Sequence, residues 1–320
     1  MDTAANVCKI TIRLVNGLVN TILFVGILTL FVFGSYSIWD SHQVHTEASS
    51  VQYGKYKPSS QNAFSFQELQ SSNPEVFSWL TVYGTHIDYP VVQGENNIKY
   101  VNTNVLGNYS VSGAIFLDYK NKKDYTDFKN ILYGHHMDRK AMFGEIGDFV
   151  DKKYFDDRRY GMLCYGGQEY GLEFFIFAHT DAYDERVFNV EVTGIDSKQE
   201  HLDYLFDLAI HTREDVAVTV DERIVLLSTC SASSTNGRDI LIGKITNEIY
   251  DDLFRTENTD KTNIPIIDEL PGLWVQAPLW VQIGIGTLPF LLILFVILTG
   301  KRRKPSRNER TTIRSIEGDR

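Results

Sequence analysis

Residues 223–245 read RIVLLSTCSASSTNGRDILIGKI, two apolar runs on either side of a loop of small polar residues. Leucine and β-branched side chains dominate both runs, which is typical of buried strands, and the serine-rich loop is typical of a connection between strands. Cys230 ends the first run and Arg238 opens the second. A thiol at the end of a strand, beside a flexible loop, lies where a nucleophile is useful. The stretch therefore predicts two neighbouring strands that carry a candidate reactive cysteine.

Short strand-like runs also fill much of the sequence before this stretch. They are rich in β-branched and aromatic residues, and turn residues bound them. Gly166-Gly167 marks the turn of a hairpin, and a further turn is expected near Gly84. The predicted strands lie within residues 81–92, 113–120, 130–137, 159–181 and 215–220.

Helices are predicted at three places. Residues 64–69 form a short helical stretch, and Ser72-Asn73-Pro74 resembles an N-cap with proline in the first turn of a second short helix that includes Leu80. The third helix spans residues 197–212, where a capping box precedes apolar residues at helical spacing. Many short strands with one inserted helix predict a mainly β fold, a closed β-barrel with N-terminal helices. A parallel α/β sheet would need helices between most strands.

Two long apolar runs bracket this region. Residues 14–39 and 280–299 are each long enough to span a bilayer. Lys9 and Arg13 precede the first run, and eight basic residues follow Gly300. Basic flanks mark the cytosolic side, which predicts a two-pass cell-membrane protein with both termini in the cytosol and the central segment outside. A cleaved signal peptide is the alternative for the first run, and a buried core helix for the second.

The charge of the chain divides between these segments. The 320 residues are 43% hydrophobic and 22% charged, which excludes a disordered or collagen-like chain, and the formal net charge is −10. Once the ten basic and four acidic residues of the two cytosolic ends are subtracted, the rest carries a net charge of −16. Such a surface disfavours a nucleic-acid partner and favours basic partners such as amine-bearing peptides, although an acidic surface is also commonly only solubilising.

Three cysteines are too few for a disulfide scaffold. Cys164 lies within a hairpin strand, where a buried inert thiol is expected. His135 ends a strand-like run, as Cys230 does, and an imidazole can serve a thiol as base or ion-pair partner. Arg238 can stabilise an oxyanion or form a surface salt bridge. Each residue alone has an ordinary structural explanation, but together they indicate a cysteine enzyme.

The order His135, Cys230 and Arg238, each at a strand end in an extracellular β domain tethered to a membrane, resembles the sortases, cysteine transpeptidases of Gram-positive cell surfaces. Residues 227–230 (LSTC) are similar to the family's Thr-Leu-x-Thr-Cys signature, with Leu226 in place of the first threonine, and Tyr133-Gly134-His135 is similar to its histidine motif. The strings that resemble class B sortases in particular are residues 79–82, 87–94, 112–118 and 133–137. The resemblance covers residues 62 to about 246.

The resemblance implies a mechanism in two steps. The Cys230 thiolate attacks the sorting motif of a surface protein, His135 protonates the departing amine, and Arg238 holds the oxyanion or the substrate backbone. An amine acceptor, deprotonated by His135, then resolves the thioester. Ser228 and Thr229 are candidate substrate contacts, with strand packing as the alternative.

No cofactor or metal is expected. Asp118, Asp124 and Asp127 have no recognised ligand spacing and are interpreted as part of a solvated loop. The expected partners are a sorting-motif-bearing surface protein or pilin, an amine acceptor (a pilin lysine or a peptidoglycan precursor) and the membrane.

The second apolar run departs from the usual class B pattern of a single N-terminal anchor. Sortases that polymerise pilins often carry such a second anchor, so the first hypothesis is an enzyme that joins pilin subunits. Attachment of a surface protein to peptidoglycan is the alternative, and a non-enzymatic membrane-anchored adhesin is a second alternative. A papain-like protease is disfavoured because its cysteine precedes its histidine. Residues 269–273 lack the Thr-Gly pair of a sorting motif, so the second run is interpreted as an anchor.

The predicted organisation is a single globular domain between two anchors. Its segments are a cytosolic N-terminus (1–13), a transmembrane helix (14–39), a spacer (40–61), the catalytic domain (62–250), a membrane-proximal linker (251–279), a second transmembrane helix (280–299) and a basic cytosolic tail (300–320).

Overall fold

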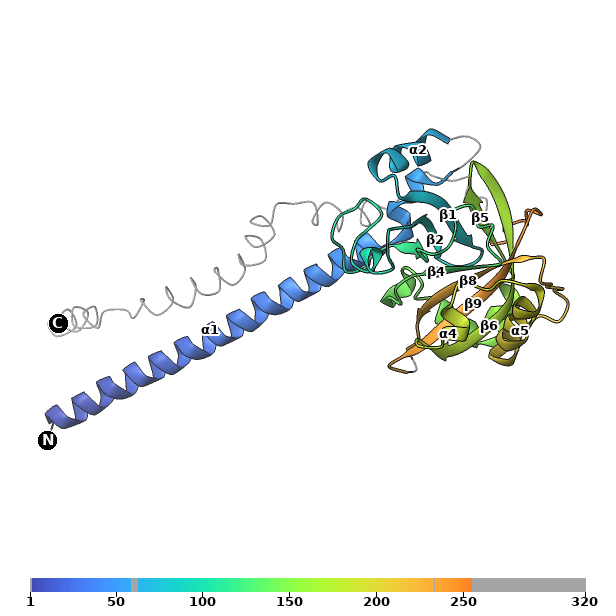
Figure 1. The fold of residues 1–320 in the computed structure, drawn as a ribbon. Coiled ribbons are helices and arrows are strands. Elements are labelled where there is room, and N and C mark those ends of the chain that lie inside the picture. Colours follow the sequence, from blue (N-terminus) through green and yellow to red (C-terminus); the bar gives the residue numbers. More distant parts are fainter. Residues whose placement is uncertain (1, 59–62, 233, 255–320) are drawn as a thin grey trace, which may run out of the picture. The chain divides into compact units, whose positions relative to one another are not determined.

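The computed structural model describes residues 2–58, 63–232 and 234–254, and within them a closed β-barrel. Eight strands follow one another in the order β5-β1-β2-β3-β4-β8-β9-β6, and β6 pairs back with β5, while β7 extends the sheet beside β6 (Figure 1). The predicted mainly β barrel is therefore confirmed. The strands are β1 (Val76–Val82), β2 (Asp88–Val92), β3 (Ile115–Leu117), β4 (Lys129–Tyr133), β5 (Tyr160–Tyr165), β6 (Gln168–Asp181), β7 (Ala209–Thr212), β8 (Arg223–Cys230) and β9 (Gly237–Thr246).

Helices lie before the barrel and in the connections between its strands. The α-helices are α1 (Asp2–Ala48), α2 (Ala63–Ser72), α3 (Lys152–Asp157), α4 (Glu185–Phe188) and α5 (Ile195–Asp207). Short 3₁₀ turns are η1 (Ser50–Gln52), η2 (Gly54–Tyr56), η3 (Lys99–Val101), η4 (Asp138–Lys140) and η5 (Ile146–Val150).

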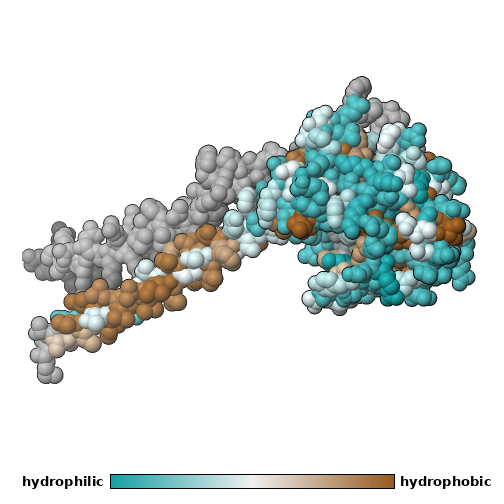
Figure 2. Space-filling view, viewed as in Figure 1, coloured by the Kyte–Doolittle hydropathy of each residue, from teal (hydrophilic) through white to brown (hydrophobic). Residues whose placement is uncertain are grey.

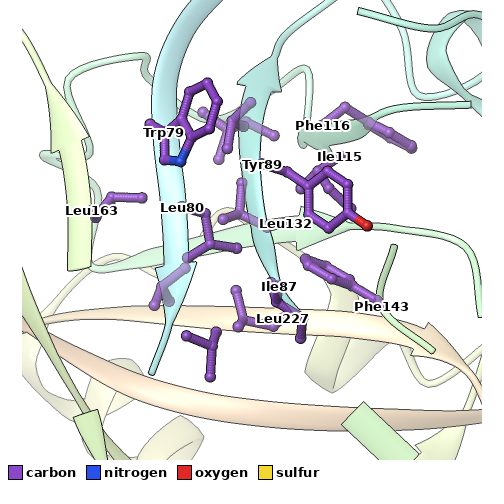
Figure 3. Close-up of a cluster of buried hydrophobic side chains, with 14 of the residues drawn as sticks. Trp79, Leu80, Ile87, Tyr89, Ile115, Phe116, Leu132, Phe143, Leu163 and Leu227 are labelled. Carbon is purple, nitrogen blue, oxygen red and sulfur yellow. The ribbon is translucent and has the colours of Figure 1, made fainter. Parts of the chain in front are cut away.

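Strand β8 is buried on both of its faces, which explains its uninterrupted apolar sequence. Successive side chains of a strand point to opposite faces, so Val225 and Leu227 enter one apolar cluster while Ile224 and Leu226 enter another. The first cluster draws on strands around the barrel and includes the side chains in Figure 3. The second contains residues of α5, such as Leu202 and Leu205. Together they fix the barrel wall that carries Cys230.

The segment after α2 differs from the prediction, since residues 76–82 form strand β1 instead of a second short helix. Asn73 ends α2 and forms a turn: its side-chain oxygen accepts from the backbone N–H of Glu75 (3.1 Å), and its amide donates to Val105 O (2.7 Å). Trp79 and Leu80 are then fully buried between strands β2 and β5. Strand pairing from both sides outweighs the local cap signal.

Two further expectations near α5 are wrong. The helix begins at Ile195 and ends at Asp207, and residues 209–212 leave it to pair with β6 as strand β7. Residues 215–220 form no strand: they are an irregular segment with turn residues at Asp215 and Val220. The backbone N–H of Thr219 donates to the Glu222 carboxylate (2.7 Å). A helical apolar period does not reveal that a neighbouring edge strand is available for pairing.

Helix α1 contains the first apolar run and continues beyond it into the predicted spacer. It is long and apolar enough to cross a membrane, and its apolar side chains are exposed along residues 14–38 (Figure 2). The segment predicted as a spacer (40–61) contributes to the core, because Ala48 and Tyr53 are buried in the first cluster. The Tyr89 hydroxyl donates to Ala48 O (2.8 Å), which joins the end of α1 to β2. The predicted linker beyond residue 254, the second span and the basic tail lie outside the described residues.

Lys129 of β4 has an almost completely buried side chain next to α4. Its Nζ donates to Val187 O of α4 at 2.8 Å. Burial lowers the pKa of Lys129 from its ordinary value to about 7, although the carboxylates of Asp118 and Asp184 oppose this shift. The side chain therefore stabilises α4 mainly by this single hydrogen bond.

This pKa predicts a specific dependence of stability on pH. Between about pH 7 and pH 10.5 the unfolded chain binds a proton at Lys129 that the folded chain does not, so folding becomes more favourable as pH rises. We expect Lys129→Met to remove this contribution, which amounts to at most about 1.4 kcal/mol per pH unit. Denaturant unfolding of both proteins at pH 7, 8 and 9, followed by tryptophan fluorescence, measures it. If the difference in the free energy of unfolding between the two proteins is the same at all three pH values, the prediction is wrong.

Candidate active site

Cys230 and Arg238 lie opposite each other at the open end of the β8–β9 pair. Side chains at paired positions of antiparallel strands point to the same face, so the two groups meet despite the loop between them. The Arg238 guanidinium donates from Nη1 to Cys230 Sγ. Cys230 is exposed at the last position of β8. The thiol is thus both accessible and in contact with a permanent positive charge.

His135 reaches the same end of the barrel because β4 and β8 pair in parallel. Tyr133 lies opposite Ser228 in this pairing, and the Gly134 N–H continues it by donating to Ser228 O (3.2 Å). Two parallel strands end at the same edge, so His135 and Cys230 leave the barrel together. His135 Nε2 lies 2.8 Å from Val101 O. A carbonyl oxygen only accepts, so we assign the hydrogen of this bond to Nε2, which orients the ring.

All five predicted site residues line one pocket of about 330 Å³. Its wall includes Tyr133 and Phe188, whose rings stack with centroids 6.4 Å apart. The hydroxyls of Ser228 and Thr229 are buried there and have no hydrogen-bond partner within the described part of the chain. The lining residues are Asn97, Val101, Phe116, Tyr133, Gly134, His135, Ala182, Phe188, Ser228, Thr229, Cys230 and Arg238.

Asp118 supports this pocket from behind, and the expectation that it belongs to a solvated loop is wrong. It is buried, and its carboxylate accepts from Asn97 Nδ2 (2.7 Å) and from the Tyr133 hydroxyl (3.1 Å). Burial, together with the neighbouring Asp118 carboxylate, raises the pKa of Tyr133. Tyr133 therefore stays a neutral donor, and Asp118 fixes two residues of the pocket wall.

The remaining thiol and imidazole groups are separate from this pocket. Cys164 is buried as predicted, and burial, followed by the charge of Glu169, raises its pKa to about 11. His136, the neighbour of His135, lines a different cavity. His201 lies on the buried face of α5, where burial and nearby Lys129 lower its pKa to about 3. Within the residues described, no group of three or more His, Cys, Asp or Glu side chains has the arrangement of a metal site.

Several pocket residues have no clear signal in the sequence. Asn97 and Val101 come from the long connection between β2 and β3, and Ala182 and Phe188 from the region around α4. Phe116, Tyr133 and Gly134, by contrast, lie within motifs that the sequence indicates. Chemically, the pocket brings a thiol nucleophile, an imidazole and a guanidinium to one surface beside buried hydroxyls, an arrangement suited to acyl transfer.

The difference between the two thiols is directly measurable. In the full chain carrying Cys8→Ser, we expect iodoacetamide at pH 7.5 to modify Cys230 and to leave Cys164 unmodified, because alkylation requires an accessible thiolate. Peptide mass spectrometry of the native and the denatured protein gives the two extents. Equal modification of both cysteines in the native protein would show that the Cys164 environment is open.

Comparison with known proteins agrees with this geometry, although no family model matches the sequence. Sortase B from the type II pilus of Streptococcus pneumoniae is 43% identical; the match covers 57% of this chain and 99% of that chain, with a TM-score of 0.51. A Streptococcus pyogenes class B sortase involved in pilus biogenesis is 40% identical, over 56% and 97% of the two chains, with a TM-score of 0.52. Sortase B of Staphylococcus aureus is 29% identical over 191 residues, which are 56% of this chain and 74% of that protein. With its barrel and its sequence in agreement, the chain belongs to the class B sortases, a family of cysteine transpeptidases.

Proposed function

We propose that Cys230, His135 and Arg238 catalyse the joining of pilin subunits, with Cys230 as the nucleophile. The observation that carries this proposal is the contact between the Arg238 guanidinium and Cys230 Sγ, in a pocket that His135 also lines. A thiolate and an oxyanion both form at this position during acyl transfer, and a fixed cation stabilises both.

The first half-reaction forms a thioester. The Cys230 thiolate attacks the threonine carbonyl of the sorting motif, a C–S bond forms, and the negative charge moves to the carbonyl oxygen beside Arg238. The C–N bond then breaks while the His135 imidazolium gives its proton to the departing amine. The hydrogen bond from His135 Nε2 to Val101 O supports this role, because it holds the ring in one orientation.

The second half-reaction transfers the acyl group. An amine attacks the thioester and passes a proton to neutral His135, the C–S bond breaks, and the Cys230 thiolate and the His135 imidazolium are regenerated. No external oxidant, metal or energy source enters this balance.

Ser228 and Thr229 are the proposed contacts to the donor backbone. Each has a buried hydroxyl without a partner within the described residues, next to the nucleophile. A bound substrate that supplied a partner would relieve this cost. The stacked rings of Tyr133 and Phe188 offer an apolar wall to donor side chains.

The comparisons favour a pilin as the donor. The two streptococcal class B sortases that are associated with pili are 43% and 40% identical to this chain, against 29% for Sortase B of Staphylococcus aureus. Attachment of a surface protein to peptidoglycan is the second candidate, since it uses the same thioester. Membership of the sortases argues against the adhesin hypothesis.

We further propose that α1 anchors the protein in the cell membrane with the barrel outside. The length and apolar surface of α1 support this placement. The second anchor and the cytosolic position of both ends remain predictions from the sequence, as do the domain boundaries.

The pilin hypothesis is tested with the full chain in detergent, a pilin that bears a sorting motif, and a peptidoglycan-type amine in the same reaction. We expect covalent pilin oligomers resistant to boiling in SDS, visible on gels and joined by an isopeptide bond in mass spectra. Cys230→Ala should form neither oligomers nor a thioester. Efficient transfer to the peptidoglycan amine without oligomers would support the second candidate instead.

A substrate contact of Ser228 can be distinguished from a packing role, because the first affects substrate binding and the second affects stability. We expect Ser228→Ala to raise KM for a cleaved donor peptide about threefold to tenfold, because a substrate hydrogen bond of about 1 kcal/mol is lost. The melting temperature should stay the same or rise, since the hydroxyl has no partner in the free protein. An unchanged KM with a lower melting temperature would assign Ser228 to strand packing.

A further inference from the structure

A second cavity, of about 710 Å³, adjoins the segments that carry the proposed catalytic residues. It lies between the turns that follow β4 and the ends of β6 and β9. Its lining includes His136, Gly147, His179, Ser231 and Asp239.

The two cavities are lined by neighbouring residues of the same three chain segments. His135, Cys230 and Arg238 line the first pocket, and the residue that follows each of them lines the second cavity: His136, Ser231 and Asp239. Arg238 and Asp239 are consecutive residues of strand β9, so their side chains point to opposite faces of that strand. Each proposed catalytic residue is thus one residue away from the second cavity.

Polar groups converge in the second cavity. The Asp239 carboxylate is largely buried and accepts from His179 Nδ1 at 3.0 Å. Gly147 leaves space beside it: a Cβ at this position would lie 3.4 Å from Asp239 Oδ2 and 3.8 Å from His136 Cε1. His136 Nδ1 is buried and has no partner within the described residues. The cavity therefore holds a carboxylate and an unpaired ring nitrogen around a small open volume.

The cations of this cavity leave the carboxylate available. Arg139 and Lys140 both line the cavity. Lys140 Nζ is paired with Glu145 (3.1 Å) and Asp148 (3.4 Å), and within the described residues neither cation forms an ion pair with Asp239. A carboxylate in a partly desolvated site binds an ammonium group by charge-assisted hydrogen bonds. A primary amine, in its ammonium form, is therefore a ligand that suits the carboxylate of this cavity.

We propose that this second cavity binds the acceptor amine, a primary alkylamine, with Asp239 as the residue that holds its ammonium form. This inference rests on the proposed function of Cys230. While the thioester exists, the acyl chain occupies the first pocket, so the acceptor needs a separate approach to the same carbonyl carbon.

The proton balance of the step is complete. The ammonium form held by Asp239 gives one proton to water and becomes nucleophilic. The amine then attacks the thioester, its second proton goes to neutral His135, and the C–S bond breaks to restore the Cys230 thiolate. The product is an amide.

The test measures how the thioester divides between amide and acid. The full chain in detergent is acylated with a donor peptide that the wild-type protein cleaves, and mass spectrometry gives the ratio of the two products. One arm contains Nα-acetyl-lysine methylamide and the other triglycine amide, which distinguish a lysine from a glycine amine. We expect Asp239→Asn to lower the amide-to-acid ratio about tenfold with at least one of these amines.

Two further variants separate recognition from misfolding. Gly147→Val should fill the space beside Asp239 and lower the ratio with the two peptide amines, but leave it unchanged with hydroxylamine, which is much smaller. Asp203→Asn makes the same change on the exposed face of α5 and should leave every ratio unchanged.

The experiment distinguishes failure of the proposed amine site from failure of the proposed function of Cys230. If the wild-type protein forms no Cys230 thioester, the proposed function is wrong. If it forms the thioester, but Asp239→Asn and Gly147→Val both give the wild-type ratio with both peptide amines, the acceptor does not use this cavity.

Discussion

The parallel pairing of β4 with β8 is the constraint on which the rest of the site depends. It sets Tyr133 opposite Ser228 and sends both strands out of the barrel at the same edge. Parallel strands need a long connection, and here the chain between β4 and β8 supplies β5, β6, β7 and the helices α3, α4 and α5. β8 is buried on both faces, so a one-residue shift of its register would move the side chains that fill each apolar cluster into the other cluster.

Sequence patterns predicted the parts of the barrel in which local and tertiary preferences agree. The hairpin at Gly166-Gly167 was correct because both glycines adopt positive φ (58° and 76°), which the turn requires. Strands β8 and β9 were correct because apolar β-branched runs are buried on both sides. The errors at residues 74–80 and 209–212 arose where a helical signal competed with a strand partner distant in sequence.

The candidate site was predictable to a similar extent. His135, Cys230 and Arg238 stand at ends of strands that the sequence already indicates, so their meeting follows once the strands pair. Asn97, Val101 and Phe188 belong to connections whose path depends on the whole barrel, and no local pattern marks them. The burial of Asp118 was also not predictable from local sequence. An aspartate close to lysines in the sequence suggests a solvated loop, but in the fold Asp118 is buried and its carboxylate accepts from Asn97 and Tyr133.

The alternation of side chains at residues 135–136, 230–231 and 238–239 has an evolutionary consequence. At each of these three places the first residue lines the catalytic pocket and the next residue lines the second cavity. A substitution at position 136, 231 or 239 alters the second cavity and leaves the residue at the preceding position unchanged. In this chain, therefore, single substitutions can give the second cavity a different lining while His135, Cys230 and Arg238 stay in place.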